Sequence, residues 1–254
     1  MKILGIKITP GTMEDLHKQI TVLVRQKCQA FILSGNIHGI NLSTKLPWLA
    51  DFYEQANLVR VDGAGVVLGA RILGKKIPPR LTWADWGWPL AAYLAEQGHS
   101  AFLLGGPPGT AEKAKDRLLA ANPLLKIVGT HHGYFEKTGD KNRSIINTIN
   151  NANPDILIIG MGMPLQERWL SDNREHLGAF VCITSGAAFE YLAGELARCP
   201  AWMGHLGFEW LYRFMQNPHR MAKRYLLGNT RFIAKVLLER LFQKKGKQKP
   251  VHDE

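Results

Sequence analysis

Short apolar runs alternate with amphipathic stretches through most of the chain. The runs are too short for ordinary helices, and each ends in small or polar residues, as buried strands do. They cover residues 30–33, 58–61, 101–104, 126–128, 156–159 and 180–183. Helical periodicity usually follows them, most clearly in residues 110–121, where Ala114, Leu118 and Leu119 share one face and Thr110 is the predicted cap.

Strands that alternate with helices predict βαβ units, and therefore an α/β protein with a Rossmann-like, mainly parallel sheet. Ligands of such sheets bind beyond the carboxyl ends of the strands. The small and polar residues that follow the predicted strands are therefore the candidate site residues. They are Ser34, Asn36, Asp62, Gly105, Gly106, Gly160, Gln166, Thr184 and Gly186.

The pattern changes near Pro200, after which only helices are predicted. A four-residue spacing relates Trp202, Leu206, Trp210 and Phe214, and residues 225–242 form a second amphipathic stretch. We therefore predict an α/β core over residues 1–197 and a helical appendage over residues 198–254.

Charge divides the chain of 254 residues at the same place. Residues 198–254 contain 12 Lys or Arg and 4 Asp or Glu, so this segment carries +8 of the net +11. Such an excess favours a phosphate-rich partner, either nucleic acid or an anionic membrane surface. The cations lie among Trp, Phe and Leu residues, a pattern that fits an interfacial helix as well as a solvated charged face.

The composition, 46% hydrophobic and 21% charged, excludes a chain that is disordered as a whole. No apolar stretch reaches the roughly 20 residues that a spanning helix needs. The first 30 residues lack the apolar region of a signal peptide, so we expect a cytoplasmic protein. The three cysteines lack metal-ligand spacing, and neither a zinc site nor a disulfide framework is expected.

Three motifs at strand ends have both a chemical and a structural interpretation. Asp62 precedes a glycine-rich turn, where a carboxylate serves as a general base or caps the next helix. Residues 102–110 form a strand, a glycine turn and a helix start, which suits a phosphate or is an ordinary βα turn. In residues 159–169, the Gln166 amide either reaches a sugar or base or caps a helix.

Two groups of rings are predicted to be structural. Trp83, Trp86 and Trp88 lie beside Arg80 and Asp85, and clustered aromatic residues are usually part of a core. His131 and His132 are predicted to be a surface or loop pair, because none of the nine histidines has the spacing of a metal site.

An ordered set of segments then covers nearly the whole chain. It comprises residues 61–67 (VDGAGVV), 72–75 with Arg80, 103–107 with 133–135, 160–167 (GMGMPLQE), 189–194 (FEYLAG), and 206–213 with Pro218, Arg220, Arg224 and Tyr225. Together these segments resemble the WecG/TagA/CpsF family of bacterial glycosyltransferases.

The resemblance implies a GT-E-like fold and an inverting transferase. Its donor would be a UDP-sugar, with an N-acetylmannosamine-type sugar expected, and its acceptor an undecaprenyl-diphosphate-linked N-acetylglucosamine or a related lipid-linked sugar. The implied role is cell-surface polysaccharide synthesis, of a teichoic acid or an exopolysaccharide. The enzyme would lie on the inner face of the cell membrane, bound peripherally to its anionic surface, with a homo-oligomer expected away from it.

The resemblance also assigns roles to residues. Asp62 matches the catalytic base, and Ser34, Asn36 and Arg80 match residues of the active-site pocket. The nucleotide-sugar site would comprise Gly105, Gly106, Tyr134, Gln166 and Glu190. The lipid diphosphate would be held at the membrane by Arg213, Arg220 and Arg224. The chain departs from the family where Ser34-Gly35-Asn36 replaces the usual Thr-Pro-Asn and where Glu190 stands for aspartate.

The sequence contains no Asp-x-Asp motif, which many glycosyltransferases use to hold a metal ion. We therefore expect no metal and no other cofactor, with the leaving diphosphate stabilised by appendage cations and by backbone N–H groups near Gly105 and Gly106. Nucleic-acid binding is the alternative, supported by net charge alone, because no helix-turn-helix, RRM or zinc-finger signature is present. A dinucleotide-dependent oxidoreductase would need a GxGxxG motif, which is missing.

Overall fold

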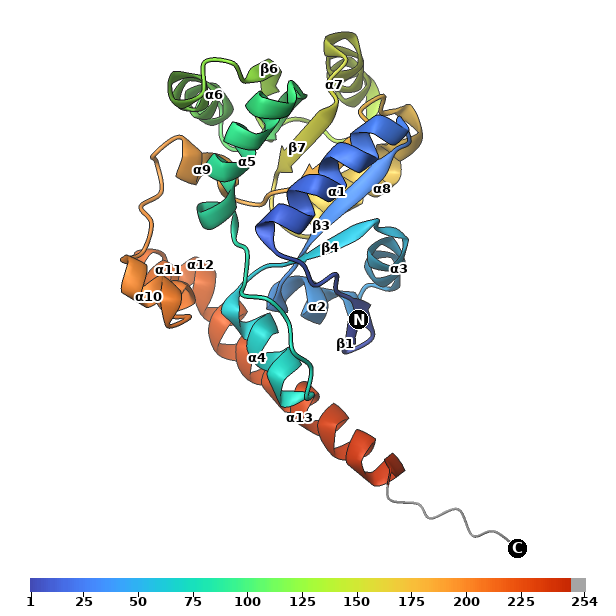
Figure 1. Cartoon of the computed structure of the whole chain (residues 1–254), viewed down its shortest axis with the longest axis vertical. Coiled ribbons are helices and arrows are strands. Elements are labelled where there is room, and N and C mark those ends of the chain that lie inside the picture. Colours follow the sequence, from blue (N-terminus) through green and yellow to red (C-terminus); the bar gives the residue numbers. More distant parts are fainter. Residues whose placement is uncertain (248–254) are drawn as a thin grey trace, which may run out of the picture.

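The centre of the molecule is a six-stranded parallel sheet in the order β4-β3-β8-β7-β5-β6 (Figure 1). The computed structural model describes residues 1–247, except for the side chains of Ala201, His205, Arg220, Lys223 and residues 244–247. The strands are β3 (Ala30–Gly35), β4 (Leu58–Val61), β5 (Ser100–Gly105), β6 (Lys126–His131), β7 (Ile156–Gly160) and β8 (Val181–Thr184). All six lie at the predicted apolar runs, and the α/β prediction is confirmed.

Alternate side chains of each strand enter two separate cores, one on each face of the sheet. In β3, Phe31 and Leu33 belong to one core, and Ala30 and Ile32 belong to the other. The first core is covered by α2 (Ile37–Ser43), α3 (Pro47–Gln55), α4 (Ala64–Ile72), α7 (Gly139–Ala152) and α8 (Leu165–Asn173). The second is covered by α1 (Met13–Gln26), α5 (Trp83–Gln97), α6 (Thr110–Ala121) and α9 (Ala188–Leu192).

Some local features differ from the prediction. A small hairpin of β1 (Lys2–Ile3) and β2 (Ile6–Lys7) precedes α1, and a 3₁₀ turn (Arg174–His176) follows α8. The cap of α6 is Gly109, in the left-handed conformation, because the Thr110 hydroxyl donates instead to Glu195 Oε2 at 2.7 Å. Trp83 and Trp86 are buried, so the prediction of an aromatic core cluster is confirmed for both.

The C-terminal segment contains only helices among its described residues. They are α10 (Ala201–His205), α11 (Glu209–Gln216), α12 (Pro218–Ala222), a π-helix (Lys223–Leu227) and α13 (Gly228–Lys247). The first amphipathic stretch divides into α10 and α11 because Gly207 adopts φ +83° between them. The last seven residues of the predicted appendage lie outside the described part of the chain, and the boundary at residue 197 stays a prediction.

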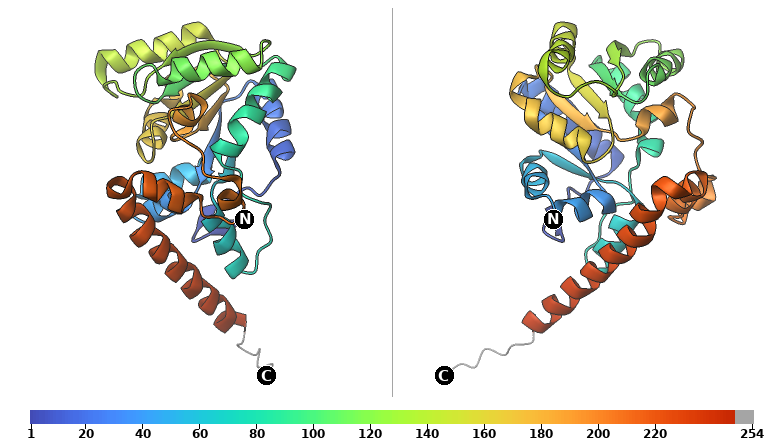
Figure 2. Two further views of the ribbon diagram at one scale, coloured as in Figure 1. Left: turned by 90° about the vertical axis from the view of Figure 1, so that its left-hand side faces the viewer. Right: turned by 180° about the vertical axis from the view of Figure 1, so that it is seen from behind.

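Helix α13 packs against the α/β core along its first part, and its C-terminal end extends away from the body (Figures 1 and 2). Phe232 and Val236 are fully buried against α4, where a Cβ at Gly69 would lie 2.7 Å from the Phe232 ring. Asn41 of α2 donates to the Gly228 carbonyl at 2.8 Å, and Glu239 accepts from Leu4 N at 3.1 Å. Helix α13 is therefore attached to both α2 and the N-terminal hairpin.

This packing predicts that Phe232→Ala destabilises the protein by about 3–5 kcal/mol, the usual cost of truncating a fully buried aromatic side chain. Phe242→Ala on the same helix is the matched control, because Phe242 is 70% exposed and its removal should change stability by no more than about 0.5 kcal/mol. Urea denaturation of both variants measures the difference. Equal stabilities would mean that α13 contributes nothing to the core.

Candidate functional site

Asp62 lies at the carboxyl end of β4, one residue before the turn that opens α4. Its backbone N–H donates to the Gly35 carbonyl at 2.9 Å, which joins the ends of β3 and β4. Its Oδ2 accepts from Asn36 Nδ2 at 3.4 Å, and Asn36 Oδ1 in turn caps α2 by accepting from Gly39 N. The carboxylate is 22% exposed, so it is held by neighbours yet remains open to a ligand.

Behind Asp62 lies a buried guanidinium that the sequence analysis did not single out. Arg60 Nη1 is 3.8 Å from Asp62 Oδ1 and donates to the Leu81 carbonyl, while Nη2 donates to Ser34 Oγ. The guanidinium also lies over the ring of Trp86, 5.1 Å from its centroid. Ser34 is therefore buried behind the site, and its hydroxyl accepts from Arg60 and donates to the Thr184 carbonyl rather than facing a ligand.

Helices of the C-terminal segment approach Asp62 from the other side. Burial disfavours the charged form of Arg213, yet the nearby Tyr191, Tyr225, Glu209 and Asp62 raise the pKa of Arg213 above its ordinary value. The Arg213 guanidinium also lies over the Tyr191 ring, 5.1 Å from its centroid. A cation of α11 is therefore within electrostatic range of the carboxylate at the end of β4.

Arg80 joins the core to the same helices. Its Nη1 lies 2.5 Å from Glu209 Oε2 of α11 and 3.7 Å from Asp85 Oδ2 of α5. Its Nη2 donates to the Gly204 carbonyl at 2.8 Å. With both amino groups engaged, Arg80 fixes α10 and α11 on the core, so its contacts in this structure are structural.

Arg224 of the π-helix is within electrostatic range of His38 of α2. Burial lowers the pKa of His38 to about 4, and the positive charge of Arg224 adds to this effect. His38 is therefore neutral at physiological pH. The side chain of Arg220 lies outside the described residues, so its predicted role cannot be related to this geometry.

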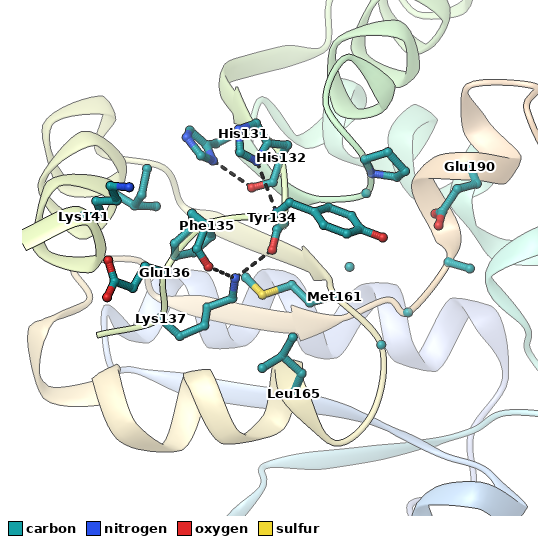
Figure 3. Close-up of a pocket in the computed structure, with 18 of the residues that line it drawn as sticks. His131, His132, Tyr134, Phe135, Glu136, Lys137, Lys141, Met161, Leu165 and Glu190 are labelled. Carbon is teal, nitrogen blue, oxygen red and sulfur yellow. Dashed lines mark hydrogen bonds between the residues drawn. The ribbon is translucent and has the colours of Figure 1, made fainter. Parts of the chain in front are cut away.

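A large pocket opens at the same edge of the sheet, beyond the ends of β5, β6, β7 and β8 (Figure 3). Its volume is about 990 Å³, within the range of sites that bind ligands larger than a single sugar. Tyr134 and Glu190 line opposite walls, and the Tyr134 ring projects into the space between them. His131 and His132 belong to the first wall, so the pair predicted at the surface lines the pocket.

Glycines form the pocket floor because backbones approach each other too closely for side chains. A Cβ at Gly105 would lie 2.2 Å from the Gly160 carbonyl oxygen, and Gly105 adopts φ +150°. Gly106 N donates to Gly160 O at 2.9 Å, and Gly133 N donates to Gly106 O at 2.8 Å. The N–H of Gly106 is thus already paired, and it is not free for the diphosphate as the sequence analysis expected.

Lys137 fixes the loop that forms the first wall. Its ammonium group donates to the carbonyls of Gly133 and Phe135, both at 2.7 Å, and lies 3.6 Å from the centroid of the Phe135 ring (Figure 3). Burial lowers the pKa of Lys137 from its ordinary value. Lys141 lines the same pocket from α7. Both side chains bring cationic groups to this wall of the pocket.

Gln166 lies beneath the pocket rather than in it. The side chain is buried, its Oε1 accepts from Gly186 N at 3.0 Å, and its Nε2 donates to Glu167 Oε1 at 2.7 Å. Gly186 lines the pocket, so Gln166 holds the wall that follows β8. Glu167 is fully buried, and its second oxygen has no hydrogen-bond partner.

Burial raises the pKa of Glu167 to about 7, against its ordinary 4.5, although hydrogen bonds from Gln166 and the backbone oppose the shift. As the pH rises from 4.5 to 7, the unfolded chain loses this proton first, so the stability of the fold decreases across that window and levels off above it. Glu167→Gln removes the effect. Its melting temperature should exceed that of the parent by several degrees at pH 8, corresponding to about 2 kcal/mol, and the difference should shrink toward pH 5.

Thermal melts between pH 5 and pH 8 test this expectation, with Glu175→Gln as the control because Glu175 is exposed on the following turn. A constant difference between Glu167→Gln and the parent across this range would contradict it.

The pocket and Asp62 share one edge of the sheet through β3 and β8. Ser34 N donates to Thr184 Oγ1 at 3.0 Å, and Trp83 Nε1 donates to the Thr184 carbonyl at 3.0 Å. Thr184 ends β8, and the chain then enters the pocket wall at Gly186. A ligand that fills the pocket and extends along this edge toward β4 would approach Asp62.

The predicted residues thus divide by position. Asp62 and Asn36 lie together at one end of the edge, with Arg213 in electrostatic range of Asp62. Gly106, Tyr134 and Glu190 line the pocket, and Ser34, Gly105 and Gln166 support these groups from behind. Their chemical roles stay predictions. Among described residues, no group of three or more His, Cys, Asp or Glu side chains is arranged to hold a metal ion. No helix within residues 1–247 is both long and apolar enough to cross a membrane.

Comparison with known proteins finds relatives that match most of the chain. A protein from Bacillus subtilis (strain 168) is 28% identical over 204 residues, which are 80% of this chain and 77% of that protein; it is named N-acetylglucosaminyldiphosphoundecaprenol N-acetyl-beta-D-mannosaminyltransferase. A protein of the same name from Staphylococcus aureus (strain MW2) is 26% identical over 223 residues, 87% of this chain and 86% of that protein. The model of the glycosyl transferase WecG/TagA/CpsF family matches residues 1–246. The chain therefore belongs to the WecG/TagA/CpsF family of glycosyltransferases.

Proposed function

We propose that this protein is an inverting N-acetylmannosaminyltransferase that uses a UDP-sugar donor. Its acceptor is N-acetylglucosamine linked through a diphosphate to undecaprenol, the acceptor that appears in the names of its relatives. The observation that carries the proposal is a partly exposed carboxylate, Asp62, on the same sheet edge as a pocket of about 990 Å³.

The donor occupies the pocket in this proposal. Tyr134 offers an exposed ring for stacking on the uracil base, and the wall that follows β8 directs the sugar toward Asp62. Lys137 and Lys141 supply positive charge near the diphosphate. The Gly106 N–H is already hydrogen-bonded to the Gly160 carbonyl, so Gly106 shapes the pocket floor rather than binding the diphosphate.

Asp62 acts as the general base of the transfer. It removes the proton of the acceptor hydroxyl while that oxygen bonds to the anomeric carbon and the bond from this carbon to the UDP oxygen breaks. A single displacement of this kind inverts the configuration at the anomeric carbon. Arg213, whose charge acts on Asp62, contacts the acceptor diphosphate and keeps it next to the base.

The leaving UDP carries more negative charge in the transition state than in the bound donor, so its oxygens need nearby positive charge. We propose that Lys137, Lys141 and the arginines of the C-terminal helices supply it, and that the reaction needs no metal. The lipid acceptor lies in the inner leaflet of the cell membrane, where the exposed apolar face of α13 and its basic residues bind.

The direct test incubates the protein with UDP-N-acetylmannosamine, UDP-N-acetylglucosamine and UDP-glucose, each with a short-chain lipid-diphosphate N-acetylglucosamine acceptor. We expect mass spectrometry to show addition of one N-acetylhexosamine from the first donor, with equal yield in excess EDTA. Absence of transfer from every UDP-sugar would contradict the proposed donor class. A strict requirement for Mg²⁺ or Mn²⁺ would contradict metal independence alone.

A further inference from the structure

Arg60 is a charged residue inside a strand that is otherwise apolar. Its side chain is only 2% exposed, and its guanidinium lies behind Asp62 rather than at the surface. It contacts three different parts of the fold: the Leu81 carbonyl, the Ser34 hydroxyl and the Trp86 ring. One side chain therefore links the ends of β3 and β4 to the start of α5.

Burying a guanidinium is costly unless a carboxylate and hydrogen-bond acceptors compensate for the lost water. Burial lowers the pKa of Arg60, and the charge of Asp62 opposes that shift. Within the described residues, Asp62 is the one carboxylate in ion-pair range of Arg60. The Nε atom of Arg60 has no hydrogen-bond partner, so this compensation is incomplete.

A hydrophobic residue would fill the same space without that cost, since the strand faces apolar rings. The cation is instead directed at the carboxylate that we propose as the base. The contact is made to Asp62 Oδ1, whereas Asn36 holds Oδ2. Each carboxylate oxygen thus has its own neighbour, and the side chain of Asp62 remains 22% exposed.

We infer that Arg60 is a positioning residue for the transfer reaction, which orients the carboxylate of Asp62 toward the acceptor hydroxyl. This inference rests on the proposed role of Asp62 as the base. Arg60 touches neither substrate, so its effect on the reaction is transmitted through Asp62. Orientation matters because a shift of about 1 Å in a catalytic group can reduce turnover by about 100-fold.

The test compares Arg60→Met, which lacks the charge, with Arg60→Lys, which keeps the charge but has a single nitrogen and cannot hold both the Leu81 carbonyl and the Ser34 hydroxyl. We expect kcat to fall by about 10–100-fold for methionine and by about 3–10-fold for lysine, with UDP affinity within about twofold of the parent. In the Asp62→Asn background, Arg60→Met should change kcat by less than about twofold, since the group through which it acts is gone.

Arg168→Met is the matched control. Arg168 also lies over a tryptophan, Trp48, and pairs with an aspartate, Asp172, but it does so on the exposed side of α8. This variant should retain the kcat of the parent. A folded Arg60→Lys enzyme with the parent kcat would overturn the inference even if the methionine variant fails to fold.

A measurement without substrate separates this inference from the proposed function. The measurement is a double-mutant cycle of melting temperatures for Arg60→Met, Asp62→Asn and the double variant. We expect the melting temperature of the double variant to fall by clearly less than the sum of the decreases in the two single variants. Additive losses would show that the pair is not coupled and would overturn the inference. If Asp62→Asn is inactive and Arg60→Met is fully active, the inference about Arg60 is overturned while the proposed base stands. If Asp62→Asn is fully active, both the proposed base and this inference are overturned.

Discussion

We expect Asp62→Asn to lower turnover by roughly 10²–10⁴-fold, the usual contribution of a positioned general base. Asparagine keeps the shape of the side chain and the hydrogen bond with Asn36, but it cannot take a proton from the acceptor hydroxyl. Binding of UDP should change by less than about twofold, because Asp62 does not line the pocket. Steady-state kinetics with a lipid-diphosphate acceptor and calorimetric titration with UDP measure the two quantities.

The same substitution should lower the melting temperature, because Arg60 loses the carboxylate that faces it. Asp51→Asn is the control, since Asp51 is exposed on α3 and lies outside the pocket lining. Near-normal turnover in Asp62→Asn would remove Asp62 from the role of base. A parallel loss of UDP binding would show instead that the substitution disturbs the whole edge of the sheet.

The second large effect is expected at the distal half of α13. Leu237, Leu238, Leu241 and Phe242 are all exposed. The pairs Leu237/Leu241 and Leu238/Phe242 are each one turn apart, so the four side chains lie on the same side of the helix. Replacing all four by glutamine, a good helix former, should reduce binding to anionic vesicles by more than about 100-fold. Full burial of a large apolar side chain contributes about 1.5–3 kcal/mol to the free energy of transfer from water. If each of the four side chains is only half buried in the membrane, their combined contribution to vesicle binding is still roughly 3–6 kcal/mol.

Activity on a water-soluble acceptor analogue should persist in this variant, because Phe232 and Val236 still hold α13 on the core. Leu124→Gln is the control, as Leu124 is also highly exposed but lies near the start of β6. Unchanged vesicle binding would refute the membrane assignment of α13. Salt-sensitive retention on DNA together with unchanged vesicle binding would favour the nucleic-acid alternative.

The sheet could be predicted from the sequence because its strands are buried on both faces and therefore read as continuous apolar runs. The hairpin β1–β2 could not, since two-residue strands are too short to show a period. The break between α10 and α11 was also missed, because the apolar spacing continues through Gly207. Burial of Phe232 against Gly69 depends on the packing of distant segments, which no local pattern encodes.

The candidate site could be predicted where residues follow strands, as Asp62 and Gly106 do. The loop of residues 131–137 was only partly recognised, because Lys137 acts through backbone carbonyls that no motif marks. Arg60 could have been recognised from the sequence, because a charged residue in the middle of an apolar strand is rarely buried without a partner. Gln166 was placed at the site by its position, but its side chain faces Gly186 and Glu167 beneath the pocket.

Strand β8 is the last strand of the chain and yet lies at the centre of the sheet, between β3 and β7. Before residues 181–184 leave the ribosome, β3–β4 and β5–β6–β7 can form only as two separate pieces. The contact between Ser34 and Thr184 spans 150 residues, so closing the sheet is a late and non-local event. A nascent chain that stalls before β8 would hold Asp62 and most of the pocket on fragments that are not joined, with unpaired strand edges exposed to aggregation.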